Sequence, residues 1–257
     1  MLQLNNICTS FNKGTIDEME LFKQFNFEVK KGEFISIVGS NGSGKTTLLN
    51  LICGTMSPDS GSIIFKGDDI TKMSEHRRAK FIGRVFQDPK LGTCSNLTVL
   101  ENFALADNKN KTFGLTGAVS KKRIDYYREK LSHCNMGLED RLNTPVGSLS
   151  GGQRQAIALV ISGMTEVDML ILDEHTAALD PKSSETIMEI TDKLVKENDM
   201  TAVMVTHNLR FATQYGNRLV MMHNGEAIMD KKAEEKEQTK VEDILHLFNE
   251  ISIECGN

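Results

Sequence analysis

The sequence predicts an α/β fold with a parallel sheet, an N-terminal antiparallel β-subdomain and an inserted α-helical subdomain. The apolar run Phe34–Val38 has strand character and is followed by a glycine-rich turn and the helical stretch Thr47–Cys53. Two more strand-like runs, Met169–Leu172 and Thr201–Thr206, are each followed by polar side chains. Between these regions, roughly over residues 88–160, apolar residues recur at helical spacing, which predicts the helical insertion.

The N-terminal region alternates apolar and polar residues in short runs. Leu2-Gln-Leu-Asn5 and Phe25–Val29 show this alternation, and Gly14 and Lys31-Gly32 supply turns. The pattern predicts antiparallel strands that lead into the strand at 34–38. A further strand is expected at Ser62–Phe65, followed by a turn at Lys66-Gly67-Asp68.

The C-terminal half continues with one helix, one hairpin and one tail. Asp180-Pro181 fits a helix N-cap with proline at the first helical position. Asn224-Gly225 fits the type I′ turn of a hairpin between strands 219–223 and 226–229. We expect an exposed loop at 107–123, a solvated charge run at 231–237 and a short amphipathic helix at 241–251.

The composition disfavours several classes of function. The chain has 257 residues, with 30 Lys and Arg against 35 Asp and Glu, and a net charge of −5. This disfavours an electrostatic nucleic-acid binder, although a local basic patch is compatible with it. No apolar run approaches the roughly 18–20 residues that span a bilayer, and we expect no signal peptide. The five scattered cysteines fit neither a zinc site nor a disulfide framework, so reduced cytosolic thiols are expected.

The turn between the first strand and helix carries the most specific chemistry. Gly39-Ser-Asn-Gly-Ser-Gly-Lys45-Thr46 fits the pattern G-x-x-x-x-G-K-[ST] of the phosphate-binding P-loop. Backbone N–H groups of such a turn and the positive end of the following helix attract phosphate oxygens. Lys45 would reach the β- and γ-phosphates, and the Thr46 hydroxyl would ligate Mg²⁺. The alternative is a chance glycine- and serine-rich turn, which the adjacent strand and helix disfavour.

A pair of carboxylates ends the strand at 169–172. Ligands bind at the carboxyl ends of strands in a parallel sheet, so Asp173 and Glu174 are expected beside the P-loop. Asp173 is suited to hold Mg²⁺ through water, and Glu174 to polarise an attacking water. The alternative is an acidic pair that caps the next helix, as is common at strand-to-helix turns.

A second anion site is predicted where Leu149-Ser-Gly-Gly-Gln153 precedes a helix. This signal is weak alone, but the P-loop, Gln87, Leu149–Gln153, Asp173-Glu174 and His207 occur in a distinctive order. The chain resembles the ATP-binding subunit of an ABC transporter, whose signature sequence is LSGGQ. The resemblance extends over about residues 2–230.

The resemblance implies roles for individual residues. Phe11 occupies the place of the aromatic residue that stacks on adenine; its alternative is a packing role in the β-subdomain. Gln87 would touch Mg²⁺ and the attacking water, and His207 the γ-phosphate. Ala178-Leu179-Asp180 matches the D-loop. His175 departs from the family pattern, in which proline commonly follows the glutamate.

These assignments form one expected ATP site with Mg²⁺. The expected catalytic residues are Glu174, His207 and Gln87, and the expected metal contacts are Thr46, Gln87 and Asp173. The expected nucleotide contacts are Phe11, Gly39, Ser40, Asn41, Gly42, Ser43, Gly44, Lys45, Thr46, Thr47, Ser150, Gly151, Gly152 and Gln153. The resemblance implies one ABC ATPase domain over 1–257, with a core of 1–87 and 161–230, a helical signature subdomain at 88–160 and a C-terminal tail at 231–257.

The resemblance also implies partners. Two ATPase subunits, identical or different, would bury two ATP molecules in a head-to-tail dimer. The segment from Gln87 to Glu101 would form a groove for a coupling helix of a membrane permease, on the inner face of the cell membrane. The chain is most similar to subunits of uptake systems that use an extracellular solute-binding protein, nearest to those with permeases of the amino-acid type. No regulatory domain is expected after Met229.

Three alternatives remain open. The first is the ATPase subunit of an exporter or a lipoprotein-release system. The second is a non-transport ABC ATPase of DNA repair or translation, which the single P-loop, the lack of a heptad run and the negative charge disfavour. The third is a P-loop GTPase or kinase, but the LSGGQ segment would then have no explanation, and this chain has no Asn-Lys-x-Asp element.

Overall fold

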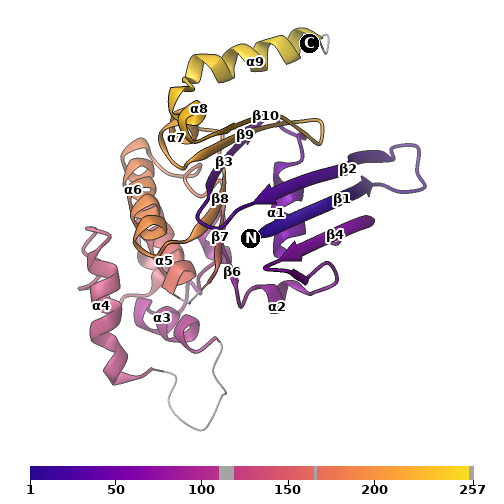
Figure 1. Cartoon of the computed structure of the whole chain (residues 1–257). Coiled ribbons are helices and arrows are strands. Elements are labelled where there is room, and N and C mark those ends of the chain that lie inside the picture. The colour runs from indigo at the N-terminus through magenta and orange to yellow at the C-terminus, as the bar shows by residue number, and fades with distance from the viewer. Residues whose placement is uncertain (110–118, 165–166, 255–257) are drawn as a thin grey trace. The chain divides into compact units, whose positions relative to one another are not determined.

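The computed structural model describes residues 1–109, 119–164 and 167–254, with side chains described to residue 251. The chain divides into two compact units, and Figure 1 labels their elements. The first unit comprises Met1–Lys72 and Val203–Asn257, and the second comprises Met73–Ala202. The middle of the predicted loop at 107–123 and Cys255 lie outside the described residues.

The first unit contains an antiparallel sheet. Its strands are β1 (Leu2–Phe11), β2 (Met19–Val29), β4 (Ser60–Phe65) and β5 (Asp68–Asp69), in the order β2-β1-β4-β5. Leu2 on the central strand pairs with Val29 on one side and Phe65 on the other, and all three are buried. This alternation places one face of β1 in the core, as the sequence pattern predicted.

A second set of strands in the first unit surrounds β3 (Phe34–Gly39), which is buried along its whole length. It pairs in parallel with β9 (Arg218–His223), and β10 (Glu226–Lys232) follows β9 as an antiparallel hairpin. Asn224 and Gly225 have φ angles of 45° and 79°, which confirms the predicted type I′ turn. Strand β8 (Thr201–Val205) crosses from the second unit into the first, and the N–H of Thr206 donates to Ile37 O at 3.1 Å.

Helix α1 (Lys45–Cys53) follows β3, and the C-terminal helices complete the first unit. These helices are α7 (Leu209–Gln214), α8 (Ala233–Gln238) and α9 (Val241–Glu254). Ile244 of α9 is buried in an apolar cluster with residues of α7, β3 and β9, to which Leu247, Phe248 and Ile251 add. The predicted solvated charge run at 231–237 is mostly exposed, with Lys236 as the exception. Lys236 is buried and its Nζ donates to Thr213 O, a partner 23 residues away that charge patterning cannot reveal.

The second unit combines two parallel strands with helices. Strand β6 (Ile82–Val85) pairs with β7 (Met169–Asp173), and α6 (Pro181–Glu197) follows β7. Asp180 caps α6 by accepting from the N–H of Ser183 at 3.0 Å, as the sequence predicted. Helices α3 (Val99–Asp107), α4 (Ile124–Ser132) and α5 (Gly151–Met164) confirm the expected helical region, and Figure 1 shows α4 beside α5.

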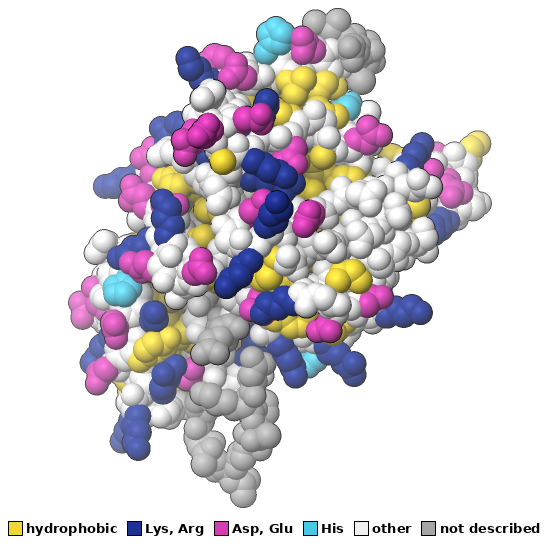
Figure 2. Space-filling view, in the orientation of Figure 1, with side chains coloured by type: hydrophobic (Ala, Val, Ile, Leu, Met, Phe, Trp, Pro, Cys, Tyr) yellow, Lys and Arg dark blue, Asp and Glu magenta, His cyan; other side chains and the backbone are white. Residues whose placement is uncertain are grey.

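Short helical turns complete the second unit: α2 (Glu75–Arg78), η1 (Pro89–Leu91), η2 (Lys121–Arg123) and η3 (Val146–Ser148). On the face drawn in Figure 2, basic and acidic side chains are interspersed, as expected from the nearly balanced composition. Within the described ranges, which omit 110–118, 165–166 and 255–257, no helix is both long and apolar enough to cross a membrane.

Candidate functional site

The P-loop of the first unit turns sharply between β3 and α1. Gly42 and Gly44 have φ angles of 78° and 101°, in the left-handed region that favours glycine. A Cβ on Gly44 would also come within 3.0 Å of the Phe22 ring. Only glycine therefore combines the required backbone angle with this close approach to β2.

The charge of Lys45 is held inside the loop. Its side chain is buried, and Nζ donates to the carbonyl oxygens of Gly39 and Ser40, each at 2.8 Å. Ser43 is tied to the β9–β10 turn, because its carbonyl accepts from Gly225 N at 3.1 Å. Thr46 lies exposed in the first turn of α1. A fixed ammonium, a helix N-terminus and an exposed hydroxyl together form a site suited to phosphate.

Two more predicted site residues lie in the first unit. Phe11 is half-buried at the end of β1, where it pairs with Met19. His207 is exposed directly after Thr206, and the Thr206–Ile37 hydrogen bond places it beside the strand that ends in the P-loop. The stacking of Phe11 on adenine and the γ-phosphate contact of His207 stay predictions.

The second unit holds the carboxylate pair at the end of β7. Glu174 has a φ angle of 47°, an unfavourable conformation for a residue with a side chain. Strained backbone of this kind costs on the order of 1–3 kcal/mol and tends to occur at functional sites. Asp173 accepts a hydrogen bond of 2.7 Å from Arg84 Nη2.

Sequence reasoning missed Arg84. Its guanidinium and the Asp173 carboxylate form an ion pair, and their side chains are only 12% and 15% exposed. A lone arginine in the apolar strand Ile82–Val85 was the available signal, because such a charge needs a buried partner. The partner lies 89 residues further along the chain, so the sequence could not identify it.

The signature segment begins α5 with a reciprocal pair of hydrogen bonds. Ser150 Oγ accepts from Gln153 N, and Gln153 Oε1 accepts from Ser150 N, both at 3.2 Å. This is the capping-box arrangement. A Cβ on Gly152 would come within 3.1 Å of Ser183, so this glycine permits close packing against the start of α6. The predicted helix N-terminus is confirmed, and its contact with a nucleotide stays a prediction.

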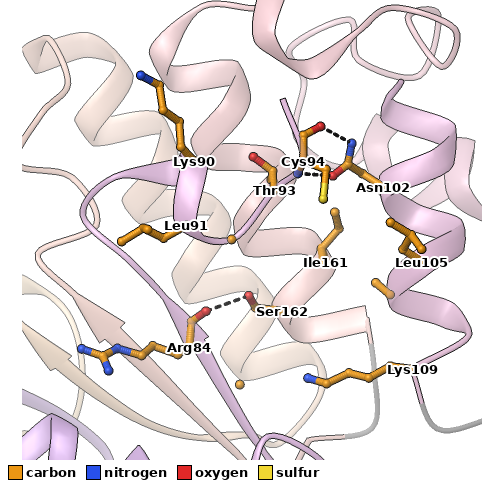
Figure 3. A pocket seen from close by; sticks show the side chains of 13 residues that line it. Arg84, Lys90, Leu91, Thr93, Cys94, Asn102, Leu105, Lys109, Ile161 and Ser162 are labelled. Atoms are coloured by element: carbon orange, nitrogen blue, oxygen red, sulfur yellow. Dashed lines mark hydrogen bonds between the residues drawn. The ribbon is translucent and has the colours of Figure 1, made fainter. Parts of the chain in front are cut away.

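Gln87 lies exposed after β6. The preceding carbonyl, of Phe86, accepts from Gln155 Nε2 at 3.0 Å, so α5 holds the backbone next to Gln87. Beyond this point the second unit has a cavity of about 510 Å³. Figure 3 shows it between the segment around Lys90 and Thr93, helix α3 with Asn102, and helix α5.

His175, which departs from the family pattern, is a buried structural residue. Its Nε2 lies 3.1 Å from Thr191 Oγ1. The Thr191 hydroxyl donates to Ile187 O at 2.7 Å, so its oxygen is left to accept a proton from Nε2. Burial lowers the pKa of His175 to about 4, so the ring is neutral at pH 7.

The expected metal contacts have the right donor chemistry for Mg²⁺. Thr46 offers a hydroxyl oxygen and Asp173 a carboxylate, which are ligands that hard cations prefer. Among the residues that the structure describes, no cluster of three or more His, Cys, Asp or Glu could hold a metal.

Comparison with known proteins gives one consistent family. The family described as "ABC transporter" matches residues 22–177. The chain is 45% identical to the tyrosine transport ATP-binding protein of Clostridioides difficile (strain R20291), over 96% of this chain and 98% of that protein. It is 34% identical to a putative hemin import ATP-binding protein, HrtA, of Staphylococcus epidermidis (strain RP62A), over 87% and 97% of the two chains.

Solved structures agree in fold. The ATP-binding cassette MJ0796, in a dimeric post-hydrolysis state with ADP and Pi, matches with a TM-score of 0.76 at 30% identity, over 90% of this chain and 98% of that one. The cbiO1 protein of Clostridium perfringens, part of the ABC transporter complex cbiONQ, matches with a TM-score of 0.75 at 26% identity, over 98% and 94%.

Proposed function

This chain belongs to the ABC transporter family as an ATP-binding subunit, and from that premise we propose that it hydrolyses ATP to drive the uptake of a small solute, such as an amino acid. Its activity is that of an ATPase coupled to transport, and its fold is the ABC ATPase fold. Subunits of this family dimerise and partner with membrane permease components.

The single observation that carries the proposal is the P-loop with Lys45 fixed inside it. Lys45 Nζ and the N–H groups at the start of α1 would bind the β- and γ-phosphates of ATP. Phe11 would stack on adenine, and Thr46 and Thr47 would lie beside the phosphates. Because Lys45 is already ordered by two carbonyl oxygens, little side-chain entropy is lost when phosphate binds.

Hydrolysis is assigned to three polar side chains. Glu174 would orient and polarise the attacking water, with help from Gln87, and His207 would contact the γ-phosphate. When bound, Mg²⁺ supplies charge neutralisation for the phosphate oxygens; Thr46, Asp173 and Gln87 would hold it. The strained backbone at Glu174 supports its assignment, since strain is retained where a side chain must be aimed.

The dimer assignment rests on two separate anion sites in one chain. Ser150, Gly151, Gly152 and Gln153 would close on the ATP held by the P-loop of a second ATPase subunit. The capping-box hydrogen bonds keep their helix N-terminus in place before any ligand arrives. The solved cassette described as dimeric supports this arrangement. The signature residues would then donate hydrogen bonds to the phosphates only after the two subunits associate, and this would couple hydrolysis to dimerisation.

The permease is assigned to the cavity of the second unit. Leu91 and Leu105 border it and are 68% and 47% exposed, so the lining offers two large apolar side chains to a partner. Lys90 and Lys109 add positive charge to its lining. A cytosolic helix of a permease, with apolar residues and one or two carboxylates, would fit this surface on the inner face of the cell membrane.

The solute class rests on the relatives. The name tyrosine transport ATP-binding protein supports an amino acid, and an extracellular solute-binding protein would then deliver it. The name hemin import ATP-binding protein also describes uptake, but of another solute, and the name energy-coupling factor transporter ATP-binding protein states no solute. One domain over 1–257 would perform the ATPase function, with 88–160 as its helical subdomain.

The test is reconstitution with the membrane partner. The tagged chain is used to capture its permease from membranes, the complex is placed in proteoliposomes, and uptake of labelled tyrosine, other amino acids and heme is measured with ATP on the ATPase side. We expect ATP-dependent accumulation of an amino acid inside the vesicles. Movement in the opposite direction, or ATP hydrolysis with no permease captured, would contradict the uptake proposal. Leu91→Asp should abolish capture while leaving the ATPase activity of the isolated chain intact.

A further inference from the structure

The strongest unassigned feature is the ion pair between Arg84 and Asp173. The guanidinium Nη2 lies 2.7 Å from the carboxylate Oδ2, and both side chains are largely shielded from water. In such surroundings a charge-assisted hydrogen bond is stronger than at the surface. Within the second unit, the carboxylate assigned to Mg²⁺ already has a cationic partner.

The position of Arg84 follows from the sheet register. Strands β6 and β7 run in parallel, with Arg84 opposite Ile171. The side chain therefore has to extend two residues along β7 to reach Asp173, and the long arginine stem spans this distance. The guanidinium also lies 4.8 Å from the centre of the Phe86 ring, a cation–π contact that further limits its movement.

The backbone of the same residue is tied to α5. Ser162 Oγ donates to Arg84 O at 3.2 Å, and Figure 3 shows this bond on one side while the guanidinium extends away from Cys94 and Asn102. A Cβ on Gly83 would come within 2.8 Å of Ser162 O, so β6 lies directly against α5. Arg84 is thus positioned by the helix that begins with the signature segment, and it cannot move far while that contact holds.

We propose that Arg84 competes with Mg²⁺ for Asp173 and thereby lowers the affinity of the nucleotide-loaded protein for the metal. A cation that is bound to one carboxylate repels a second cation and neutralises the charge that attracts it. To bind Asp173, Mg²⁺ must therefore displace the guanidinium from the carboxylate or share the carboxylate with it. Arg84 is a positioning residue in this scheme, since it acts through Asp173 and not on ATP. The proposal rests on the assignment of Asp173 to Mg²⁺ made above.

The test measures binding of ADP to the full chain, in EDTA and in excess Mg²⁺, by titration calorimetry. The ratio is the dissociation constant in EDTA divided by the dissociation constant in Mg²⁺. It reports how strongly the metal and the nucleotide favour each other's binding, and its measurement needs no catalysis. Arg84→Met, which keeps an unbranched side chain but no charge, should raise this ratio about tenfold, as expected for loss of one charged hydrogen bond. Arg84→Gln should move it in the same direction, and Arg84→Lys, which keeps the charge, should stay near wild type.

Two further variants make the outcomes distinguishable. Arg128→Met removes an exposed arginine of the same unit, paired with Asp125 at 3.7 Å, and should leave the ratio unchanged. Asp173→Asn should lower the ratio. If it does not, the assignment of the metal to Asp173 is wrong and both proposals fall. If Asp173→Asn lowers the ratio but Arg84→Met and Arg84→Gln leave it unchanged or lower it, only the competition by Arg84 is overturned. Should the methionine variant fail to fold, the glutamine and lysine variants decide the matter alone.

Discussion

Lys45 Nζ lies 2.8 Å from the carbonyl oxygen of Gly39, the residue that ends the strand leading into the P-loop. The lysine therefore stabilises the turn. In the proposed complex with ATP, phosphate binding would exchange these carbonyl partners for more strongly charged oxygens.

Lys45→Ala should weaken ATP binding about a hundredfold, because it removes the charged hydrogen bonds to phosphate. Binding is measured by titration with ATP and Mg²⁺. Lys23→Ala is the matched control: Lys23 is 70% exposed, lies in the same unit and pairs only weakly with Glu20 at 3.9 Å. Unchanged nucleotide affinity in Lys45→Ala would mean that this turn is not the triphosphate site.

Gly44→Ala should destabilise the P-loop more than a left-handed backbone angle alone explains. Its φ angle is 101°, and the new Cβ would be 3.0 Å from the Phe22 ring. Gly67→Ala is the control, since Gly67 has a φ of 93° and no atom within 4 Å of its Cβ position. Both changes should cost about 1–2 kcal/mol in backbone strain, and only Gly44→Ala should add a packing cost and weaken ATP binding. Equal loss in urea unfolding, with ATP affinity retained, would show that the ring simply moves aside.

Ser150→Ala tests whether the signature serine does more than cap a helix. Loss of its capping hydrogen bond should cost about 1 kcal/mol of stability. Thr98→Ala removes the corresponding residue of the capping box on α3, in the same unit, and should cost a similar amount. We expect ATPase activity to fall at least tenfold in Ser150→Ala only, because a second subunit's phosphates lose a donor. Parallel losses of activity in the two variants would reduce Ser150 to a structural role.

His175 should make stability fall in mild acid. Burial lowers its folded pKa to about 4 from an unfolded value of 6.5, so the unfolded chain binds the proton more readily. The contribution of neutral, buried His175 to the free energy of unfolding is complete above pH 6.5 and is lost as pH falls from 6.5 towards 4. Between pH 7 and pH 5 the loss should be about 2 kcal/mol.

The pH effect is measured by denaturant unfolding of the wild type and of His175→Gln, which can still donate to Thr191 but does not titrate. His246→Gln, at a histidine that is 75% exposed, should keep the wild-type pH dependence. A pH profile of His175→Gln that overlays the wild type would show that other groups cause the acid sensitivity.

Local signals in the sequence predicted the elements well, because local chemistry determines them. Asn224-Gly225 specified its turn through two left-handed residues, and Asp180 specified the start of α6. The P-loop and signature motifs placed their helix N-termini correctly for the same reason.

Tertiary partners could not be predicted. Lys236 looked like a surface charge, yet a carbonyl oxygen at Thr213 accepts from it in the folded chain. The partner of Asp173 lies on another strand, and the partner of His175 lies on the helix that follows. These pairings depend on sheet register and helix packing, which periodicity in one sequence does not determine.

Glu174→Gln tests the central claim most directly. The variant keeps the size of the side chain and removes the charge that would polarise water. ATP hydrolysis should fall by a factor of about 10²–10³ while ATP affinity is retained, and an ATP-dependent dimer should appear on gel filtration. Glu189→Gln, at an exposed position on α6, serves as the control and should behave as wild type. Normal hydrolysis by Glu174→Gln, with no nucleotide-dependent dimer, would contradict the account of this chain as an ATPase subunit that dimerises around bound ATP.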